Sequence, residues 1–399
     1  MKAIHFITSL ILFTSFWSCK KDDNSTHTVD YTVHVEYPES YQTQQAAAVQ
    51  VTLKNTFTGE EKQASTDTQG AAAFTGLLPG VYQITASRDL SAAEALQQTG
   101  LEGEVFLSAS LSNYSIQETG SVSLKLRGSS PGGWVIKEIY YTGAPGGGFY
   151  SNDQFYELYN NSADTLYADG LSIGDAAGNP YISASSKPSG FASDTEYVYF
   201  QHIFTIPGDG QTYPVAPGKT FLIARSAINH KSDATLGNPN SPVDLGKGIA
   251  DIEVYWEGAN RDTDNPDVPN MIVDYFMTAT AHDWIPTVFG PSIVIFRQDD
   301  IDKLPRVLEP GSTSTKVYPQ VPVSSVIDAV DCVRNASVGH FKRLPTNVDA
   351  GFQFCTNSYT GESLRRKVKT EINGRKILQD TNNSSADFEL RSSPTPKSW

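Results

Sequence analysis

Alternating hydrophobic and polar residues dominate this chain and predict short β-strands rather than long helices. From Val29 to Tyr37, tyrosine and valine occupy every second position, and polar residues fill the positions between them. A period of two residues turns one row of side chains to a core and the other to water, as in a half-buried strand. The stretches 49–53 and 122–126 repeat this pattern.

One short helix is expected among these strands. Ser91 and Glu94 have the spacing of a capping box, in which each side chain accepts a hydrogen bond from the other residue's backbone N–H. Gly100 is a suitable end for the helix, because the residue beyond a last helical turn often takes a left-handed conformation.

A change of composition divides the chain into two parts. Residues 128–133 read Gly-Ser-Ser-Pro-Gly-Gly, which is typical of a linker. The full length of 399 residues exceeds what one hydrophobic core usually serves. We therefore expect one strand-rich domain at 29–127 and a larger one at 134–399.

The N-terminal part carries a recognisable series of turns and strands. Thr66, Asp67 and Gly70 form the first turn, Phe74 lies in a strand, and 78–84 gives a second turn and strand. These residues resemble the carboxypeptidase regulatory-like and collagen-adhesin B-type modules. The resemblance implies a small seven-stranded sandwich of the prealbumin or immunoglobulin kind.

The C-terminal part opens with two strands around a glycine-rich turn at 143–148. The second strand, 155–160, reads aromatic, acid, aliphatic, tyrosine, asparagine, and the strand near 166–175 is closed by an aspartate. With the later matches at 216–224 and 382–388, this order resembles the lamin-tail domain.

The resemblance implies an immunoglobulin-like sandwich enlarged by long loops. We place these insertions at 176–212, 226–270 and 304–322, where Pro, Gly, Asn and Asp concentrate. The predicted fold class is therefore all-β, with two β-sandwich domains, of which the C-terminal one is lamin-tail-like with long loop insertions.

The first residues indicate export from the cytoplasm. Lys2 is followed by a mostly apolar run at 4–17, which is shorter than the roughly 20 residues of a membrane-spanning helix. The run ends at Cys19 after a small serine, and this arrangement resembles a bacterial lipoprotein signal. The resemblance implies a signal peptide at 1–18, a lipid on Cys19 and a tether at 19–28. The alternative is an ordinary cleaved secretion signal with an incidental cysteine.

The charges after the cysteine refine this location. Lys21, Asp22 and Asp23 resemble the surface-export signal of Bacteroidota lipoproteins. The resemblance implies a lipid-anchored protein on the outer face of the outer membrane.

Net charge argues against one class of partner. The formal charge of −14 repels phosphate backbones, so no nucleic-acid partner is expected. The basic run at 365–369 is local, and we expect it on the solvated side of a strand.

Two cysteines remain once Cys19 is assigned to lipid. In an oxidising compartment Cys332 and Cys355 can form a disulfide, whose closed loop would contribute on the order of 3 kcal/mol. Two free buried thiols are the alternative, because the sequence does not show whether the two positions meet.

Candidate catalytic and metal motifs are weak. Ser172 lies in a Gly-x-Ser-x-Gly pattern, but no helix follows to form a nucleophile elbow, so catalysis is not expected. Asp262, Asp264 and Asp267 are hard oxygen donors of the kind calcium prefers. Calcium is the one cofactor considered, and a solvated turn is the alternative.

Aromatic residues are frequent in the glycine-rich turn and in the predicted insertions. Loops present binding residues on many sandwiches, and aromatic side chains there can contact a ligand or partner. The alternative is that they pack the insertions onto the sheets. The candidate residues are Phe149, Tyr150, Tyr181, Tyr213, Tyr255 and Trp256.

Together these features predict a non-catalytic surface lipoprotein that binds a ligand or partner. The combination of signal, small sandwich and lamin-tail-like part resembles a Bacteroidota lipoprotein family often associated with TonB-dependent transporters, which implies an accessory role beside such a barrel protein. A cell-surface adhesion or structural protein is the first alternative, and a secreted hydrolase is the second.

Overall fold

The structure of the chain is a computed structural model, and nearly all of its regular structure is β-strand. It therefore confirms the all-β class. The predicted lipidation and export residues, Cys19, Lys21, Asp22 and Asp23, lie outside the described residues. Within the described part of the chain, no helix is both long and apolar enough to cross a membrane. The described residues are 27–38, 41–99, 105–129, 133–146, 149–259, 262–278, 282–372 and 374–399.

An N-terminal sandwich is formed by two sheets that close on one core. The smaller sheet has the order β4-β1-β7 and the larger β3-β2-β5-β6-β8. Alternating residues of β1, such as Val33 and Val35, are buried between the sheets, as the two-residue period predicts. The strands are β1 (Val29–Glu36), β2 (Gln50–Asn55), β3 (Glu61–Ser65), β4 (Ala71–Leu77), β5 (Gly80–Leu90), β6 (Val105–Ile116), β7 (Gly120–Lys125) and β8 (Arg127–Ser129).

The predicted helix is present as α1 (Ala92–Thr99). The Ser91 backbone N–H donates to Glu94 Oε2 at 3.0 Å, and the Glu94 N–H donates to Ser91 Oγ at 3.4 Å. These two bonds are the capping box expected from the sequence. Gly100 lies outside the described residues.

A C-terminal sandwich is built from a six-stranded and a seven-stranded sheet. The first has the order β16-β15-β10-β9-β22-β25, and the second β19-β20-β13-β12-β18-β21 with β17 paired to β13. Its main core lies between the sheets and includes Ile139, Leu158 and Ile295.

The elements of this sandwich follow in chain order. They are β9 (Trp134–Tyr140), β10 (Phe155–Asn160), β11 (Leu166–Tyr167), β12 (Ser172–Ala176), β13 (Tyr197–Thr205), β14 (Pro214–Val215), β15 (Thr220–Ala224), β16 (Ile252–Glu253), β17 (Ile272–Phe276), β18 (Ser292–Phe296), η1 (Ile301–Lys303), β19 (Arg306–Leu308), β20 (Val317–Pro322), η2 (Val323–Ser325), β21 (Val326–Asp331), η3 (Ala336–Phe341), β22 (Ser363–Arg366), β23 (Val368–Ile372), β24 (Arg375–Leu378), α2 (Ser384–Asp387) and β25 (Phe388–Arg391).

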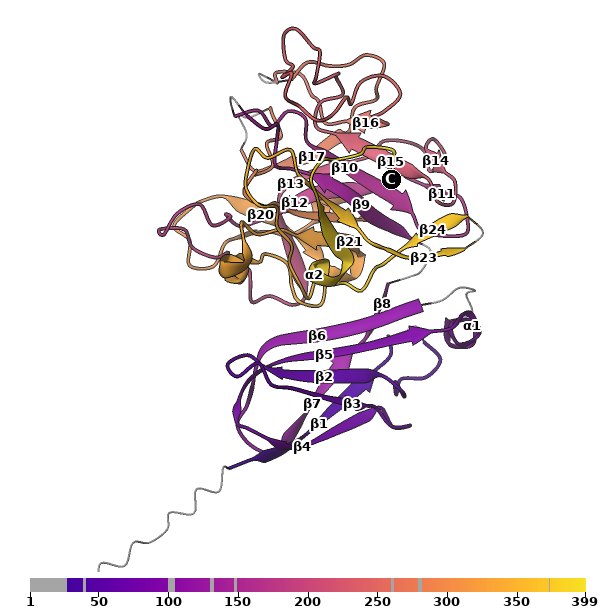
Figure 1. Cartoon of the computed structure of the whole chain (residues 1–399), viewed down its shortest axis with the longest axis vertical. Coiled ribbons are helices and arrows are strands. Elements are labelled where there is room, and N and C mark those ends of the chain that lie inside the picture. Colours follow the sequence, from indigo (N-terminus) through magenta and orange to yellow (C-terminus); the bar gives the residue numbers. More distant parts are fainter. Residues whose placement is uncertain are drawn as a thin grey trace, which may run out of the picture.

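The two sandwiches lie one above the other along the longest axis of the molecule (Figure 1). The long strands β5 and β6 turn toward the C-terminal sandwich, and the loops before and after β16 lie at the opposite end of the molecule. Polar contacts cross the junction. Asn382 Nδ2 donates to Ser108 Oγ at 3.1 Å, and Lys369 pairs with Asp89 at 2.9 Å.

Two of the predicted insertions contribute strands to the seven-stranded sheet. The range 176–212 contains β13, which pairs with β12, β17 and β20 and lies inside that sheet. The range 304–322 contains β19 and β20. Both ranges are rich in turn residues, which obscured these strands in the sequence. The residues of β13 are also mostly buried on both faces and therefore do not alternate.

The basic run at 365–369 and the predicted linker also differ from expectation. Arg365 and Arg366 are buried in β22, each beside carboxylates, so the expectation of a solvated strand face is wrong for them. Residues 128 and 129 of the predicted linker belong to β8, which pairs with β6.

Candidate functional site

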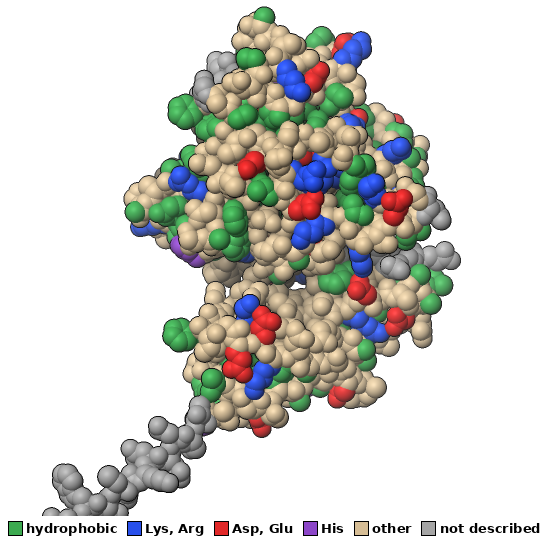
Figure 2. Space-filling model, viewed as in Figure 1, with side chains coloured by type: hydrophobic (Ala, Val, Ile, Leu, Met, Phe, Trp, Pro, Cys, Tyr) green, Lys and Arg blue, Asp and Glu red, His purple; other side chains and the backbone are tan. Residues whose placement is uncertain are grey.

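A cleft lies between the two sandwiches, lined by residues of both. Its larger part has a volume of about 930 Å³ and a smaller part about 280 Å³. The parts run together because Ser110, Thr346, Asn347 and Asn382 line both. The larger part alone has a volume in the range of small-molecule sites. The space-filling view shows the molecule hollowed at this junction (Figure 2).

The walls of the cleft come from segments far apart in the sequence. Strands β6 and β7 supply one wall, and η2, the start of β21 and the loops at residues 346–348 and 380–382 supply the other. Both walls carry apolar positions, including leucines and valines, among hydroxyl and amide side chains that can donate and accept hydrogen bonds. The hydroxyl and amide residues are Ser110, Ser123, Thr195, Ser324, Thr346, Asn347 and Asn382.

Two polar atoms in these walls lack a protein partner. Ser110 Oγ and Asn347 Oδ1 are buried, and no hydrogen bond joins either atom to a described residue. The Asn347 amide is held by its other end, because Nδ2 donates to the Thr195 carbonyl at 2.8 Å. Leaving a buried polar atom unpaired costs about 1–3 kcal/mol, so two in one cleft need a reason.

Arg127 is a cation without a counter-ion in the same cleft. The guanidinium is partly buried, and within the described residues no carboxylate or hydrogen-bond acceptor pairs with it. Burial lowers the pKa of Arg127 below its ordinary value. Partly desolvated charges in proteins are usually paired, so this group can take an anion.

A second arginine adds to the positive charge. Arg297 lines the cleft and donates to the carbonyls of Asp169 and Tyr167 at 2.7 and 2.8 Å, which fixes its side chain without neutralising it. The carboxylates of the cleft, Asp328 and Asp380, are instead ion-paired to Arg366. The uncompensated charge in the cleft is therefore positive, on a chain whose total charge is −14.

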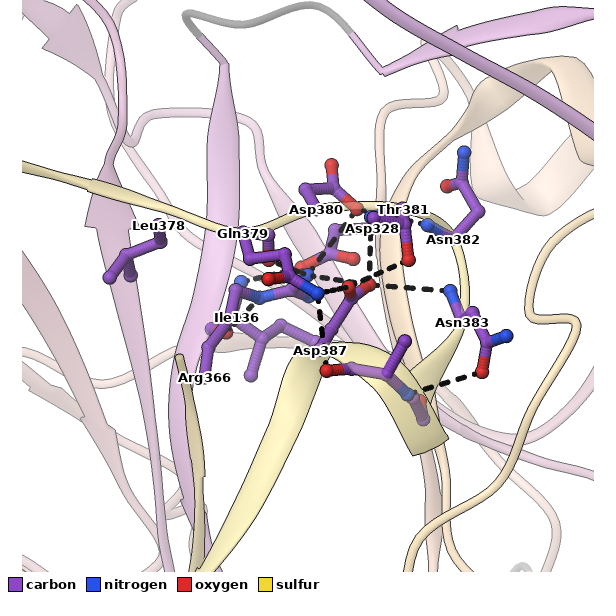
Figure 3. A network of polar contacts seen from close by, with 12 residues as sticks. Ile136, Asp328, Arg366, Leu378, Gln379, Asp380, Thr381, Asn382, Asn383 and Asp387 are labelled. Carbon is purple, nitrogen blue, oxygen red and sulfur yellow. Dashed lines mark hydrogen bonds and ion pairs between the residues drawn. The ribbon is translucent and has the colours of Figure 1, made fainter. Parts of the chain in front are cut away.

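The network around Arg366 forms the rigid edge of this site (Figure 3). Arg366 is 1% exposed and lies 2.5 Å from Asp328, 3.3 Å from Asp380 and 3.5 Å from Asp387. It also donates to the Ile136 carbonyl at 2.8 Å. Burial raises the pKa of Asp328 to about 7, despite the opposing effect of Arg366. The network joins β9, β21 and β22 to the C-terminal segment that carries Asn382.

The predicted loop aromatics do not gather at one site. Tyr150 donates to the Leu236 carbonyl at 2.6 Å, and Tyr181 packs on Phe341. Tyr213 packs on Phe221, and Trp256 on Phe276.

Two further predicted aromatics remain. Tyr255 is half-buried, whereas Phe149 is 91% exposed and meets the ring of Tyr359 at its edge. For Tyr150, Tyr181, Tyr213 and Trp256 the packing alternative therefore describes the structure.

The predicted calcium ligands are not brought together. Asp264 Oδ1 accepts from Asn270, Asp267 pairs with Lys247 at 3.6 Å, and Asp262 accepts from the Thr263 N–H. In the described residues no group of three His, Cys, Asp or Glu side chains is placed to hold a metal. Each of the three carboxylates instead interacts with a different neighbouring donor group.

The two cysteines are free thiols buried in the main core of the C-terminal sandwich. Burial raises the pKa of Cys355 to about 12. The Cys355 backbone N–H donates to the Tyr141 hydroxyl at 2.9 Å. Of the two alternatives left open by the sequence, the structure contains free thiols and no disulfide between them.

Ser172 and the histidines form no nucleophilic site in the described structure. Ser172 lies within β12 and shares a hydrogen bond of 2.7 Å with Thr205 Oγ1. His202 pairs with Asp175 at 2.7 Å, and Asp175 also accepts from Trp284 Nε1 at 3.0 Å. This pair is buried and fixes the packing between β12 and β13.

Other carboxylates with raised pKa values hold the segment around β16. Burial raises the pKa of Glu253 to about 7, and its two oxygens accept from the backbone N–H groups of Ala227 and Asn265 at 2.6 and 2.8 Å. Burial also raises the pKa of Asp153 to about 6, and Asp153 accepts from Tyr140 and Ser241. These groups fasten the segment to the sheet.

Sequence reasoning missed the cleft residues. The glycine-serine linker indicates a boundary, and a boundary is a usual place for a cleft. Arg127 directly precedes that linker, and this position is the sequence signal that connects Arg127 with the cleft. Ser110 and Asn347 give no such signal, because their lack of partners depends on how the sandwiches stack.

Comparison with known proteins connects the C-terminal part to a family. Residues 216–395 match the family described as "Protein of unknown function (DUF4876)". The matched region holds β15 to β25, which include strands of both large sheets and the separate pair β23-β24. No curated protein matches the chain.

Solved structures extend the likeness. A DUF4876 family protein from Bacteroides thetaiotaomicron VPI-5482 is 27% identical, with a TM-score of 0.59 over 90% of this chain and 94% of that one. A protein described as a "putative adhesin" from Bacteroides ovatus ATCC 8483 is 9% identical, with a TM-score of 0.21 over 79% of this chain and 90% of that one. The second likeness is too low to bear on fold or function.

Proposed function

We propose that this protein is a non-catalytic ligand-binding lipoprotein of the outer-membrane surface, and that the cleft between its sandwiches is the binding site. The observation that carries the proposal is the pairing of an open cavity with polar groups that lack partners. Ser110 Oγ, Asn347 Oδ1 and the Arg127 guanidinium lie in walls of one cleft, and a bound molecule would supply the missing partners.

The location rests on the first 23 residues. A short apolar run, Cys19 and the charges of Lys21, Asp22 and Asp23 follow the order of a surface lipoprotein signal. Two or more acyl chains would hold the protein without a spanning segment, since each buried methylene contributes about 0.8 kcal/mol. In Figure 1 the described chain begins at the end of the N-terminal sandwich farthest from the C-terminal one. An anchor at that end would place the N-terminal sandwich between the membrane and the C-terminal one.

The absence of catalysis is part of the proposal. Its support is that Ser172 lies within a strand and that the pair of His202 and Asp175 is buried beneath aromatic packing. An accessory role beside a TonB-dependent transporter is the wider setting, and the family resemblance supports it.

A substitution that fills the cleft tests the binding site. Thr346 lines both parts of the cavity and is half-exposed, so Thr346→Trp should occupy the space with little effect on either core. Full-length protein in detergent is titrated with a panel of neutral and acidic oligosaccharides, and binding is measured by calorimetry. Ligands that bind the original protein should lose at least tenfold in affinity on Thr346→Trp. Unchanged affinity would place the site elsewhere.

A matched control separates blocking from unfolding. Thr360 lies in a loop outside the cleft walls, so Thr360→Trp introduces the same side chain away from the cavity. Both variants should keep the midpoint of thermal unfolding within a few degrees.

The anchor has its own test. Cells that express the original protein and Cys19→Ser are labelled with a palmitate analogue and then treated with an external protease. The original protein should carry label and be digested on intact cells. Equal labelling of both variants would contradict lipidation at Cys19, and protection from the protease would contradict surface exposure.

Partnership with a barrel is tested by affinity purification from outer membranes. Recovery of a TonB-dependent barrel protein is the expected result. Recovery of no barrel would favour the adhesion or structural alternative.

A further inference from the structure

The cleft carries information about the chemistry of what it binds. Resting on the binding site proposed above, this inference concerns the class of ligand. Three features of the walls bear on it: the charge of the cleft, the direction of the missing hydrogen bonds and the character of the surrounding side chains.

The positive charge of the cleft favours an anionic ligand. Arg127 and Arg297 line the cleft, and no ion pair within the described residues neutralises either guanidinium. The carboxylates of Asp328 and Asp380 also line it, but both are held by Arg366 at 2.5 and 3.3 Å. A planar guanidinium with free N–H groups binds carboxylate, sulfate or phosphate through paired hydrogen bonds.

The missing hydrogen bonds require a donor as well as an anion. Asn347 Oδ1 is an acceptor and needs a hydrogen from its partner, whereas Ser110 Oγ can donate or accept. A fully deprotonated inorganic anion such as sulfate supplies acceptors alone and cannot satisfy Asn347. The molecule that fits both groups carries an acidic group together with hydroxyl or amide hydrogens.

The surrounding side chains favour a sugar over a peptide. Serines on one wall, and serine, threonine and asparagine on the other, match the mixed donor and acceptor character of sugar hydroxyls. Tyr167, which is 38% exposed, also lines the cleft and offers a ring surface for the apolar face of a sugar. The volume of about 930 Å³ leaves room for more than one ring.

We propose that the cleft binds an acidic saccharide, and that Arg127 is the residue that binds its anionic group. Arg297 contributes positive charge from a fixed position. Ser110 and Asn347 bind hydroxyl groups of the same molecule. The acidic group is a carboxylate, a sulfate or a phosphate, and the probes below distinguish these sources.

The test is calorimetric titration of the full-length protein in detergent with five probes. The first three are tetragalacturonate, which carries carboxylates, a sulfated chondroitin tetrasaccharide, and mannose 6-phosphate. The other two are neutral maltotetraose and an acidic peptide of alternating aspartate and serine. At least one acidic saccharide should bind at least tenfold more tightly than maltotetraose.

Substitution of Arg127 identifies the anion-binding group. Arg127→Gln should weaken the acidic saccharide at least tenfold and leave maltotetraose within twofold, and Arg127→Lys should restore part of the loss. Lys316→Gln is the matched control, because Lys316 is exposed, lies outside the cleft and carries the same charge. It should change affinity by less than twofold.

The outcomes separate this inference from the proposed function. Equal binding of acidic and neutral saccharides, or full affinity in Arg127→Gln, overturns the anion assignment, while loss of binding in Thr346→Trp would keep the cleft as the site. Preferred binding of the acidic peptide overturns the saccharide class. Failure of every acidic saccharide to bind at millimolar concentration overturns the inference as a whole.

Discussion

Removal of the Arg366 side chain should destabilise the C-terminal sandwich far more than removal of an exposed arginine. Arg366 is 1% exposed and lies within 3.5 Å of the carboxylates of Asp328, Asp380 and Asp387. It also donates to the carbonyls of Ile136 and Gln379 at 2.8 and 3.1 Å. Arg366→Met keeps most of the side-chain volume but removes the charge and every donor.

The size of the effect follows from what the substitution leaves behind. Three carboxylates lose their cation, and two carbonyls lose a charged donor. Breaking a buried ion pair by removing one partner costs about 3–5 kcal/mol. For a unit of 150–250 residues, 1 kcal/mol moves the unfolding midpoint by about 2–4 °C. The expected drop for Arg366→Met is therefore roughly 6–20 °C.

The assay is calorimetry of the full chain, with Arg391→Met as the control. Arg391 pairs with Glu389 at 3.4 Å on the neighbouring strand β25, and both side chains are more than 40% exposed. An exposed ion pair contributes about 0–1 kcal/mol, so the control should move the midpoint by at most a few degrees.

The pH dependence gives a second signature. Burial raises the pKa of Asp328 and of Asp387. Lower pH lets these orphaned carboxylates take up protons, so the loss in Arg366→Met should be smaller at pH 5 than at pH 8. Equal midpoints for Arg366→Met and Arg391→Met, or a loss that does not depend on pH, would refute the account of this network.

Further predictions concern pH, the thiols and the segment around β16. Burial raises the pKa of Asp328 and Glu253 to about 7, so the folded chain keeps protons that the unfolded chain releases between pH 4 and 7. Stability should fall as pH rises through this window, by on the order of 3 kcal/mol between pH 5 and 7.5 in denaturant titrations. His230, whose pKa burial lowers to about 4, opposes this trend below pH 6.5, and a rise in stability over the same window would contradict the carboxylate assignment. Cys332 and Cys355 should react with a maleimide after denaturation without reductant and not before, and a mass two hydrogens short would reveal a disulfide instead. Glu253→Ala should lower stability by about 2–4 kcal/mol, because two buried N–H groups lose their acceptor, and should expose residues 228–265 to limited proteolysis; digestion identical to that of the original protein would contradict this role.

The sequence predicted the β-class because the two-residue period is strong where one face of a strand is buried. The run from Val29 to Tyr37 shows this period for β1. The capping-box spacing of Ser91 and Glu94 predicted α1. The sequence analysis placed β13 in a loop insertion, because that strand lies inside a sheet, is buried on both faces and so shows no alternation.

The candidate site was less accessible to sequence reasoning. Aromatic residues in loops looked like recognition groups, yet Tyr213 and Trp256 pack on neighbouring rings, since long segments need a core of their own. The lack of partners at Ser110 and Asn347 is a property of the stacked sandwiches. A local pattern of residue types does not record it.

Hydrogen–deuterium exchange of the full chain, with and without the acidic saccharide probe that binds most tightly, tests the cleft most directly. The account predicts slower exchange in 106–111, 123–127, 346–348 and 380–383, the segments that form both walls. Protection confined to the loops between residues 226 and 270, or no protection at any concentration of the probe, would contradict it.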